Sequence, residues 1–286
     1  MKAALEASPE TVGVEQANWS WKGVRAFVQQ RFGRTLSPSS CFNYLHRLDF
    51  VLKRPKKRLL KADEDKRTAF VESYAALRQE AKAQGAKLFF VDEAHFRADV
   101  ELRAKWVLRG QPALADSTSP RRGEKATYYS AVCLETGEVE AMNVTETCTA
   151  ETSAAFLRLL RQKHPQPLIV IWDNGPAHRG DALRMYLATP NLKVRLVALP
   201  GYSPDFNADE AIWDWIRDEV TANICFGTAA KVRAKVDVFF AGLAHRTAEV
   251  QQRCRTVLQS RADALMATPN QLCPQVAHVD LTLESV

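Results

Sequence analysis

The fold is decided by the stretch LIVIWDNGP at residues 168–176. Its first part, 168–172, is apolar and rich in β-branched side chains, which predicts a strand that is buried on both faces. The remainder, Asp-Asn-Gly-Pro, is a turn signal. Asp173 is therefore expected at the carboxyl end of a buried strand, which is where open α/β sheets bind their ligands.

Two more carboxylates stand at comparable places on either side of this stretch. Upstream, the apolar run 86–91 predicts another strand, and Asp92 and Glu93 follow it directly. Downstream, a polar loop leads into a helix that begins near Asp209 and Glu210, with apolar residues at helical spacing after it. Two aspartates at strand ends and one glutamate at a helix start can converge on one place. Carboxylate oxygens grouped in this way suit Mg²⁺ or Mn²⁺.

The motifs around these acids resemble those of a known enzyme family. The segment YSPDFNADEAIW at 202–213 resembles the third-acid motif of bacterial transposases of the IS630 group, within the Tc1/mariner superfamily of DDE enzymes. The other two matches are Asp173-Asn174 with His178 in the second-acid motif, and Val91-Asp92-Glu93 with Trp106 and Gly110 in the first-acid region. The chain departs from the family at Ala208, where proline is usual.

The resemblance implies a ribonuclease H-like fold and a DNA transposase that cleaves DNA and transfers the cut strand. It implies that Asp92, Asp173 and Glu210 are the catalytic residues and hold two Mg²⁺ or Mn²⁺ ions, with Asp92 bridging both. The supporting residues that it implies are Glu93, Asn174 and His178. Its expected partner is double-stranded DNA, at transposon ends and at the target, bound by a homodimer or a larger assembly.

Three assignments stay open on the residues alone. Asp209 competes with Glu210 for the role of third ligand, and only the register of the motif selects Glu210. Glu93 is either a helper or a surface acid. His178 either touches the metal shell or the DNA, or is an ordinary structural histidine.

Positive charge is concentrated near the amino terminus. Residues 1–61 carry 12 Lys and Arg against 4 Asp and Glu, a net charge of +8, whereas the rest of the chain carries −2. This localisation favours a segment that binds nucleic acid over a protein that is basic throughout.

The basic segment has the pattern of a helix-turn-helix. Apolar residues recur at helical spacing over 19–32, a turn follows, and Ser37 with Pro38 predicts the start of a second helix. That helix is expected to turn Cys41, Phe42, Leu45 and Leu48 inward. The residues that we expect to contact DNA are Ser39, Ser40, Asn43 and Arg47 on its outer face and Lys53, Arg54, Lys56, Lys57 and Arg58 after it. The alternative is a plain helical hairpin, but the basic run favours contact with phosphates.

The order of the remaining elements indicates an α/β fold. Strands are expected at 87–92, 106–108, 126–133, 139–144, 168–172 and 194–199, and helices at 63–84, 149–163, 180–187, from 209, and over most of 229–265. The predicted organisation is a helix-turn-helix domain, winged-helix-like, at 1–61, a helical linker at 62–86, a catalytic domain at 87–266 and a loose tail at 267–286.

Composition excludes some classes of protein. No apolar stretch reaches the length of a membrane span, and no signal-peptide pattern is present. The 6 cysteines form no Cys-x-x-Cys pair, which argues against a zinc site and fits a reducing cytoplasm. A bacterial, nucleoid-associated protein of the cytoplasm is expected.

Two rival functions remain. Members of the family often carry two helix-turn-helix units, and this chain begins just before the second, so a truncated or degenerate copy that only binds DNA is one alternative. Another ribonuclease H-like nuclease is the second, although the third-acid motif argues against it.

Overall fold

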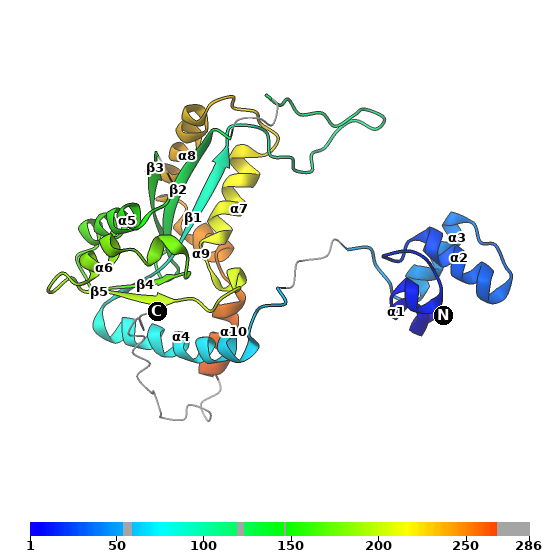
Figure 1. Ribbon diagram of the computed structural model, residues 1–286, viewed down its shortest axis with the longest axis horizontal. Coiled ribbons are helices and arrows are strands. Elements are labelled where there is room, and N and C mark those ends of the chain that lie inside the picture. Colours follow the sequence, from blue (N-terminus) through cyan, green and yellow to red (C-terminus); the bar gives the residue numbers. More distant parts are fainter. Residues whose placement is uncertain (54–58, 119–122, 146, 268–286) are drawn as a thin grey trace. The chain divides into compact units, whose positions relative to one another are not determined.

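The computed structural model describes residues 1–53, 59–118, 123–145 and 147–267. The chain divides into two compact units, residues 1–58 and residues 59–286 (Figure 1). Four of the predicted DNA contacts, Arg54, Lys56, Lys57 and Arg58, lie outside the described residues, as does the tail from 268 onward.

A five-stranded mixed sheet forms the centre of the larger unit, with the order β3-β2-β1-β4-β5. Its strands are β1 (Lys87–Arg97), β2 (Lys125–Cys133), β3 (Glu138–Val144), β4 (Leu168–Trp172) and β5 (Val194–Ala198). The strand β1 pairs with β2 in antiparallel fashion and with β4 in parallel, and β5 continues the parallel half. The predicted turn at Gly137 joins β2 to β3.

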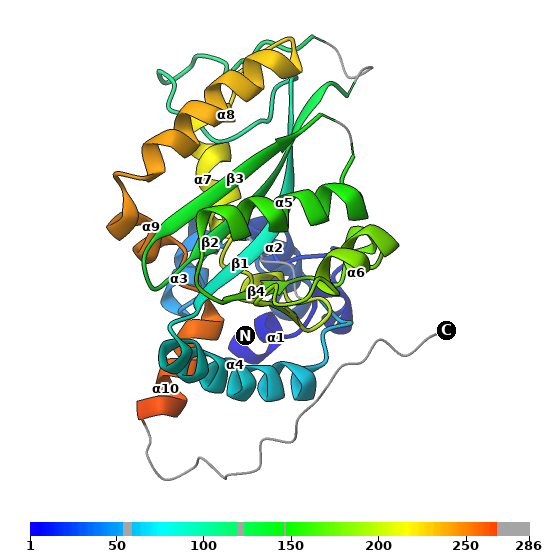
Figure 2. The same cartoon turned by 90° about the vertical axis from the view of Figure 1, so that its left-hand side faces the viewer.

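Helices cover both faces of this sheet, as Figures 1 and 2 show. They are α4 (Glu64–Gln84), α5 (Ala150–Lys163), α6 (Asp181–Leu187), α7 (Glu210–Ile216), α8 (Ala229–Leu243), α9 (Thr247–Arg253) and α10 (Val257–Ala267). Side chains of α5 and α6 share one apolar core with Phe89 and Val170, while those of α4, α7, α8, α9 and α10 share another with Phe90 and Ile171. Because neighbouring residues of a strand face opposite sides, β4 is buried along its whole length, as expected.

The first strand is longer than predicted. We expected it to end at Asp92, but β1 continues to Arg97, so Asp92 lies in the middle of a strand. The parallel pairing of β1 with β4 stops at Phe90 and Ile171, and beyond that point β1 continues because β2 supplies an antiparallel partner. Asp92 therefore lies just past the end of β4, on the neighbouring strand of Asp173.

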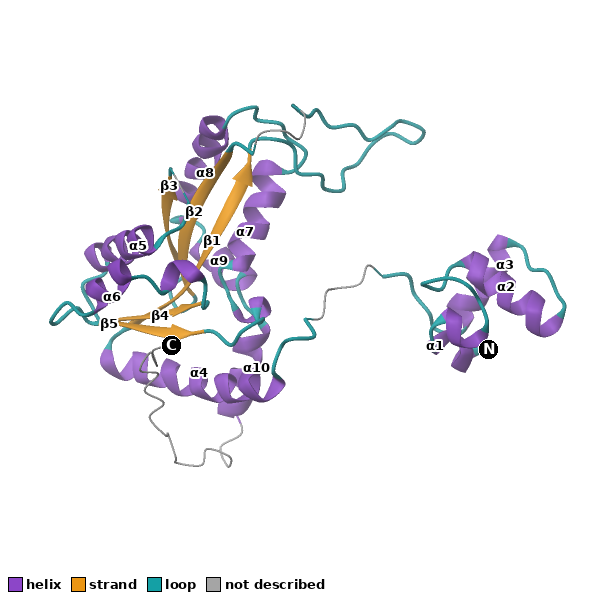
Figure 3. Ribbon diagram, viewed as in Figure 1, coloured by secondary structure: helices purple, strands orange, loops and turns teal. Residues whose placement is uncertain are grey.

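One other expectation about an element was wrong, while the prediction that most of 229–265 is helical is confirmed. Residues 106–108 form no strand, and Trp106 is fully exposed. The described part of the connection after β1 contains one β-bridge, between Glu101 and Ala222. The long helical region from 229 is interrupted twice, giving α8, α9 and α10. Figure 3 shows the connection after β1 as a loop that extends away from the sheet.

The smaller unit consists of α1 (Lys2–Glu6), a 3-10 turn at Pro9–Val12, α2 (Trp21–Phe32) and α3 (Pro38–Arg47). The hydroxyl of Ser37 accepts a hydrogen bond from the Ser40 amide, which is the predicted cap of α3. Cys41 is buried against α2, but Phe42 is 46% exposed, so its predicted inward position is wrong. Within residues 1–53 no strand is described. Across both units, no described helix has the length and apolarity needed to cross a membrane.

Candidate active site

The three predicted acids border one cleft in the larger unit. Asp92, Asp173 and Glu210 all line an opening of about 540 Å³, together with the loop from Leu199 to Pro204. Asp92 comes from β1, Asp173 directly follows β4, and Glu210 is the first residue of α7. Three segments that are far apart in the sequence thus bring carboxylates to one place.

Asp92 is the most strongly perturbed of the three. Burial raises its pKa well above the ordinary value, and repulsion from Glu210 and Glu93 raises the pKa further. One of its oxygens, Oδ2, accepts a hydrogen bond of 3.2 Å from Trp213 Nε1 on α7. The indole therefore orients this carboxylate, while the neighbouring acids make its charge costly without a cation.

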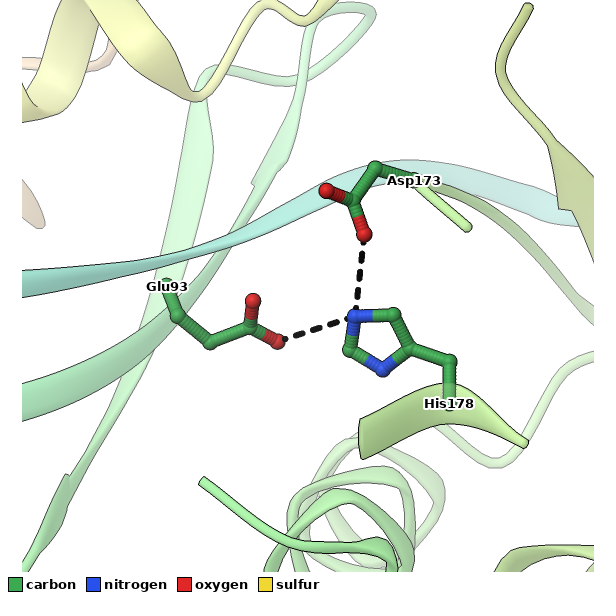
Figure 4. Close-up of side chains that lie close together, drawn as sticks. All are labelled: Glu93, Asp173 and His178. Atoms are coloured by element: carbon green, nitrogen blue, oxygen red, sulfur yellow. Dashed lines mark ion pairs between the residues drawn. The ribbon is translucent and has the colours of Figure 1, made fainter. Parts of the chain in front are cut away.

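Asp173 is held by the turn that follows β4. Its Oδ1 accepts a hydrogen bond from the Gly175 amide at 2.8 Å and forms an ion pair with His178 Nε2 at 3.1 Å (Figure 4). The hydrogen bond from His178 lowers the pKa of Asp173. A Cβ at Gly175 would lie 3.0 Å from this same oxygen, so a larger residue there would push on the carboxylate of Asp173.

His178 lies between two carboxylates, and Figure 4 shows its ring between Asp173 and Glu93. Its Nε2 is 3.4 Å from Glu93 Oε1, and its ring lies 4.0 Å from that of Trp172. Burial lowers the pKa of His178, but hydrogen bonds to Asp173 and Glu93 outweigh burial and raise the pKa to about 9. At neutral pH the imidazolium therefore links the two acids.

Glu93 faces away from the cleft. Because successive side chains of a strand alternate, Glu93 and Asp92 lie on opposite faces of β1. Trp172 Nε1 donates a hydrogen bond of 3.1 Å to Glu93 Oε1. Glu93 thus reaches the site only through His178, and it does not line the cleft beside Asp92.

Glu210 and Asp209 have different surroundings although they are adjacent. Glu210 borders the cleft, and burial raises its pKa. Asp209 is fully buried; its Oδ2 accepts a 2.5 Å hydrogen bond from Ser130 of β2, and its Oδ1 has no hydrogen-bond partner among the described residues. Of the two acids that the sequence left open, the structure places only Glu210 at the cleft.

The segment that carries the third motif is fastened to the rest of the unit. Asp205 accepts two hydrogen bonds from Arg67 of α4, at 3.0 and 2.7 Å, and the same guanidinium lies 4.1 Å from the centre of the Phe206 ring. Asn207 Nδ2 donates to the Val91 carbonyl at 3.1 Å, next to Asp92. Sequence reasoning missed Arg67; its one signal is an arginine on the apolar face of a helix.

Asn174 also forms a hydrogen bond that holds a loop of the cleft in place. Its side-chain nitrogen donates a hydrogen bond of 3.2 Å to the Leu199 carbonyl, which ties the loop after β4 to the end of β5. Asn174 also lines the cleft. It therefore supports the shape of the opening next to Asp173.

Two sets of residues have the ligand types for a metal ion. Among the described residues, Glu93, Asp173 and His178 bring ligand atoms within 4.8 Å of one another. In that set His178 Nε2 already forms ion pairs with Asp173 and Glu93, at 3.1 and 3.4 Å, and a metal ion there would have to displace the proton of the imidazole. The cleft set, Asp92, Asp173 and Glu210, is all carboxylate, and its mutual repulsion is what a divalent cation relieves. The cleft set fits Mg²⁺ or Mn²⁺ better.

The predicted DNA contacts of the smaller unit lie on its surface. Ser39, Asn43, Arg47 and Lys53 are exposed, and Ser40 is half-buried. Ser39, Asn43 and Arg47 therefore form an accessible polar face on α3, opposite the buried Cys41.

Comparison with known proteins gives consistent matches. A family model described as "DDE superfamily endonuclease" matches residues 87–233, and one described as "Winged helix-turn helix" matches residues 15–74. The "Insertion element IS630 uncharacterized 39 kDa protein" of Shigella sonnei is 25% identical over 228 residues, which are 78% of this chain and 64% of that protein. The chain thus spans just under two thirds of the length of this curated relative.

Solved structures of the Mos1 transposase have a similar fold. Its paired-end complex with the left transposon end aligns with a TM-score of 0.57 at 19% identity, over 85% of this chain and 79% of that chain. Its paired-end complex with Mg aligns with a TM-score of 0.56, again at 19% identity and over 85% and 79% of the two chains. The predicted α/β core preceded by a helix-turn-helix is confirmed.

Proposed function

The chain belongs to the DDE superfamily endonuclease family, and from this premise we propose that it is a transposase of the IS630 type, which cuts DNA at the ends of an insertion element and transfers the cut strand to a target. The observation that carries the proposal is the convergence of Asp92, Asp173 and Glu210 on one cleft. The similarity to an IS630 protein and to the Mos1 fold supports it.

The three carboxylates would hold two ions of Mg²⁺ or Mn²⁺, with Asp92 shared and Asp173 and Glu210 holding one each. When bound by these carboxylates, such ions would supply the Lewis acidity that activates a water or a DNA 3′-hydroxyl and that stabilises a leaving oxygen. Trp213 orients Asp92, and His178 and the Gly175 amide orient Asp173. The residues of the chain thus orient two of the three carboxylates, Asp92 and Asp173, before DNA arrives, which is preorganisation.

The helix-turn-helix of the smaller unit would select the DNA. The exposed face of α3 carries Asn43 and Arg47, and Lys53 follows it. Side chains of this kind read base edges and phosphates when a helix enters the major groove. A homodimer or larger assembly would pair two transposon ends.

The experiment is Mg²⁺- or Mn²⁺-dependent nicking of a duplex that carries the ends of the chain's own element. Asp92→Asn, Asp173→Asn and Glu210→Gln are expected to lose nearly all nicking activity, because each removes a ligand of the ions, with duplex binding nearly intact. Asp209→Asn is the matched control, since Asp209 does not border the cleft, and it should cut like wild type.

Two results would contradict this assignment. If Asp209→Asn is inactive while Glu210→Gln cuts normally, the third ligand is Asp209. If the wild-type chain binds DNA but never cuts, with either metal and with its own ends, it acts as a DNA-binding protein without the enzymatic step.

A further inference from the structure

The candidate active-site cleft is also lined by positive and aromatic groups that the metal site does not use. Arg179 and Tyr202 both line the cleft, and the start of the larger unit passes the same opening at Leu59. Lys61, two residues further along, places its Nζ 5.7 Å from the centre of the Tyr202 ring. We call Lys61, Arg179 and Tyr202 the rim group.

Tyr202 is held in an unusual backbone conformation. Its φ is +58°, in the left-handed region, and among the described residues it is the only aromatic one with positive φ. An L-residue costs about 1–3 kcal/mol there, and such residues persist where the surrounding structure requires them. Glycine adopts this conformation without cost, and Gly201 is next to it. A tyrosine at this position therefore points to a role for its side chain.

Packing does not supply that role. The Tyr202 side chain is 54% exposed, whereas the aromatic residues Phe206 and Trp213 of the same motif are 0% and 1% exposed. The Tyr202 ring thus contributes little to the apolar core of the unit. Its one described ring contact is with Lys61.

The charges of the rim group suit a nucleic-acid strand. Arg179 is exposed, and within the described residues no carboxylate forms an ion pair with it. Lys61 is also exposed. The carboxylates of the cleft repel a phosphodiester, so a strand that reaches them needs cations beside them. Exposed aromatic rings next to cations are how proteins hold unpaired nucleotides, by stacking on the base and pairing with the phosphate.

We propose that Tyr202, Lys61 and Arg179 form a binding subsite for an unpaired nucleotide next to the scissile phosphate. The Tyr202 ring stacks on the base, and Lys61 and Arg179 pair with the flanking phosphates. This inference rests on the proposed function, because it assumes that a DNA strand occupies the cleft. It adds that the strand at the cleft is locally unpaired when it is bound.

The test uses the full-length chain and a duplex with a single-stranded extension that carries 2-aminopurine beside the junction. Stacking on an aromatic ring changes 2-aminopurine fluorescence, and a blunt duplex of the same length measures affinity without an unpaired base. Tyr202→Phe keeps the ring. Tyr202→Gly removes the ring and accepts the positive φ, so it is expected to fold.

The expected result is that wild type and Tyr202→Phe give the fluorescence change and bind the extended duplex about tenfold more tightly than the blunt one. Tyr202→Gly should lose both effects. Arg179→Ala should weaken binding and lower the salt slope by about one. Lys193→Gly is the matched control, because Lys193 also has positive φ but does not line the cleft, and it should behave like wild type.

A Tyr202→Gly variant that binds the extended duplex and changes its fluorescence as wild type does would overturn the proposal. So would equal affinity of wild type for both duplexes, which indicates contact with paired DNA only. Cleavage is measured separately. Cutting without a fluorescence change contradicts the subsite alone, and a fluorescence change without cutting contradicts the enzymatic function alone.

Discussion

Asp209 and Glu210 are neighbours in the sequence, but only one of them reaches the cleft. The start of α7 turns the glutamate towards Asp92 and Asp173 and turns the aspartate towards Ser130 in the sheet. Asp209 is fully buried, and one of its carboxylate oxygens has no hydrogen-bond partner within the described parts of the chain. A buried polar atom without a partner lowers the stability of the fold. Because Asp209 does not line the cleft, Asp209→Asn serves as a control for experiments on the cleft.

Divalent ions should stabilise the protein through the cleft acids. Binding to the folded state alone adds about 2.7 kcal/mol at a ligand concentration of 100 times the dissociation constant. We expect Mg²⁺ to raise the melting temperature of wild type and of Asp209→Asn, and to leave that of Asp92→Asn nearly unchanged. Thermal melts with Mg²⁺ and with EDTA measure this. An equal rise in Asp92→Asn would place the ion elsewhere, with Glu93, Asp173 and His178 as the alternative set.

At the residue scale, the motifs pointed to three acids that the structure brings to one cleft, but the contacts of these acids were not predictable. Sequence spacing shows that Glu93 follows Asp92, yet the opposite faces of β1 decide that only Asp92 meets the cleft. The position of His178 between two carboxylates depends on the fold of the turn after β4. Such contacts between distant segments leave no periodic signal in the sequence.

At the element scale, an ion pair between Arg67 of α4 and Asp205 holds the loop that carries the third motif. The hydrogen bonds from Arg67 lower the pKa of Asp205. Because the pKa of Asp205 is lower in the folded state, the ion pair stabilises the fold fully above the ordinary pKa of an aspartate, near 4. This stabilisation is lost as the pH falls through the lowered pKa of the folded state. The side chain of Asp205 is 47% exposed, so solvent screening keeps the contribution at about 1 kcal/mol.

We therefore expect Asp205→Asn to lower the free energy of unfolding by about 1 kcal/mol at pH 7 and by progressively less in acid. Urea denaturation at several pH values measures the difference. Asp181→Asn is the control, because Asp181 pairs with Arg184 on the surface of α6 and both side chains are mostly exposed; it should change little at any pH. A deficit for Asp205→Asn that stays constant into strong acid would rule out the ionic contribution.

The hairpin between β2 and β3 needs its glycine for two reasons. Gly137 has a φ of +72°, and a Cβ there would overlap the carbonyl group of Thr247 at the start of α9. We expect Gly137→Ala to cost about 3 kcal/mol of stability. Gly242→Ala, in the helix α8 with open space around it, should instead stabilise by about 0.5–1 kcal/mol. Chemical denaturation measures the free energy of unfolding of both variants. An unchanged value for Gly137→Ala would mean that α9 moves away easily.

The limits of prediction at this scale concern element ends. The buried strand β4 and the helix α4 were predictable because apolar runs and helical periodicity are local signals. The true end of β1 could not be predicted. The residues after Asp92 remain in the sheet because they pair with β2, and this pairing depends on the tertiary structure. The run at 106–108 looked like a strand, but no strand in the part of the chain that the structure describes pairs with it.

At the scale of the whole molecule, charge is divided between two compact units. The segment 1–61 carries a net charge of +8, and it includes all of the smaller unit. We expect it to supply most of the affinity for duplex DNA. Replacement of Lys56, Lys57 and Arg58 by alanine should lower the slope of log affinity against log salt by about one per lost phosphate contact.

The measurement is a titration of duplex DNA over a salt series. The paired control replaces Lys231 and Lys235, two exposed lysines of α8 in the larger unit, and should leave the slope near that of wild type. Identical slopes for all three proteins would show that the basic run makes no phosphate contacts.

The long connection after β1 has a practical consequence. The strands on either side of it are paired up to Arg97 and Lys125, and the Ala98 amide continues the ladder by donating to the Glu124 carbonyl at 2.8 Å. The two ends are therefore fixed next to each other by the sheet, and each doubling of the length between them costs only about 0.6 kcal/mol. The exposed tip near Trp106 and Leu108 is thus a natural place to insert a peptide tag or a fluorophore, for following the protein on DNA without a fusion at either terminus.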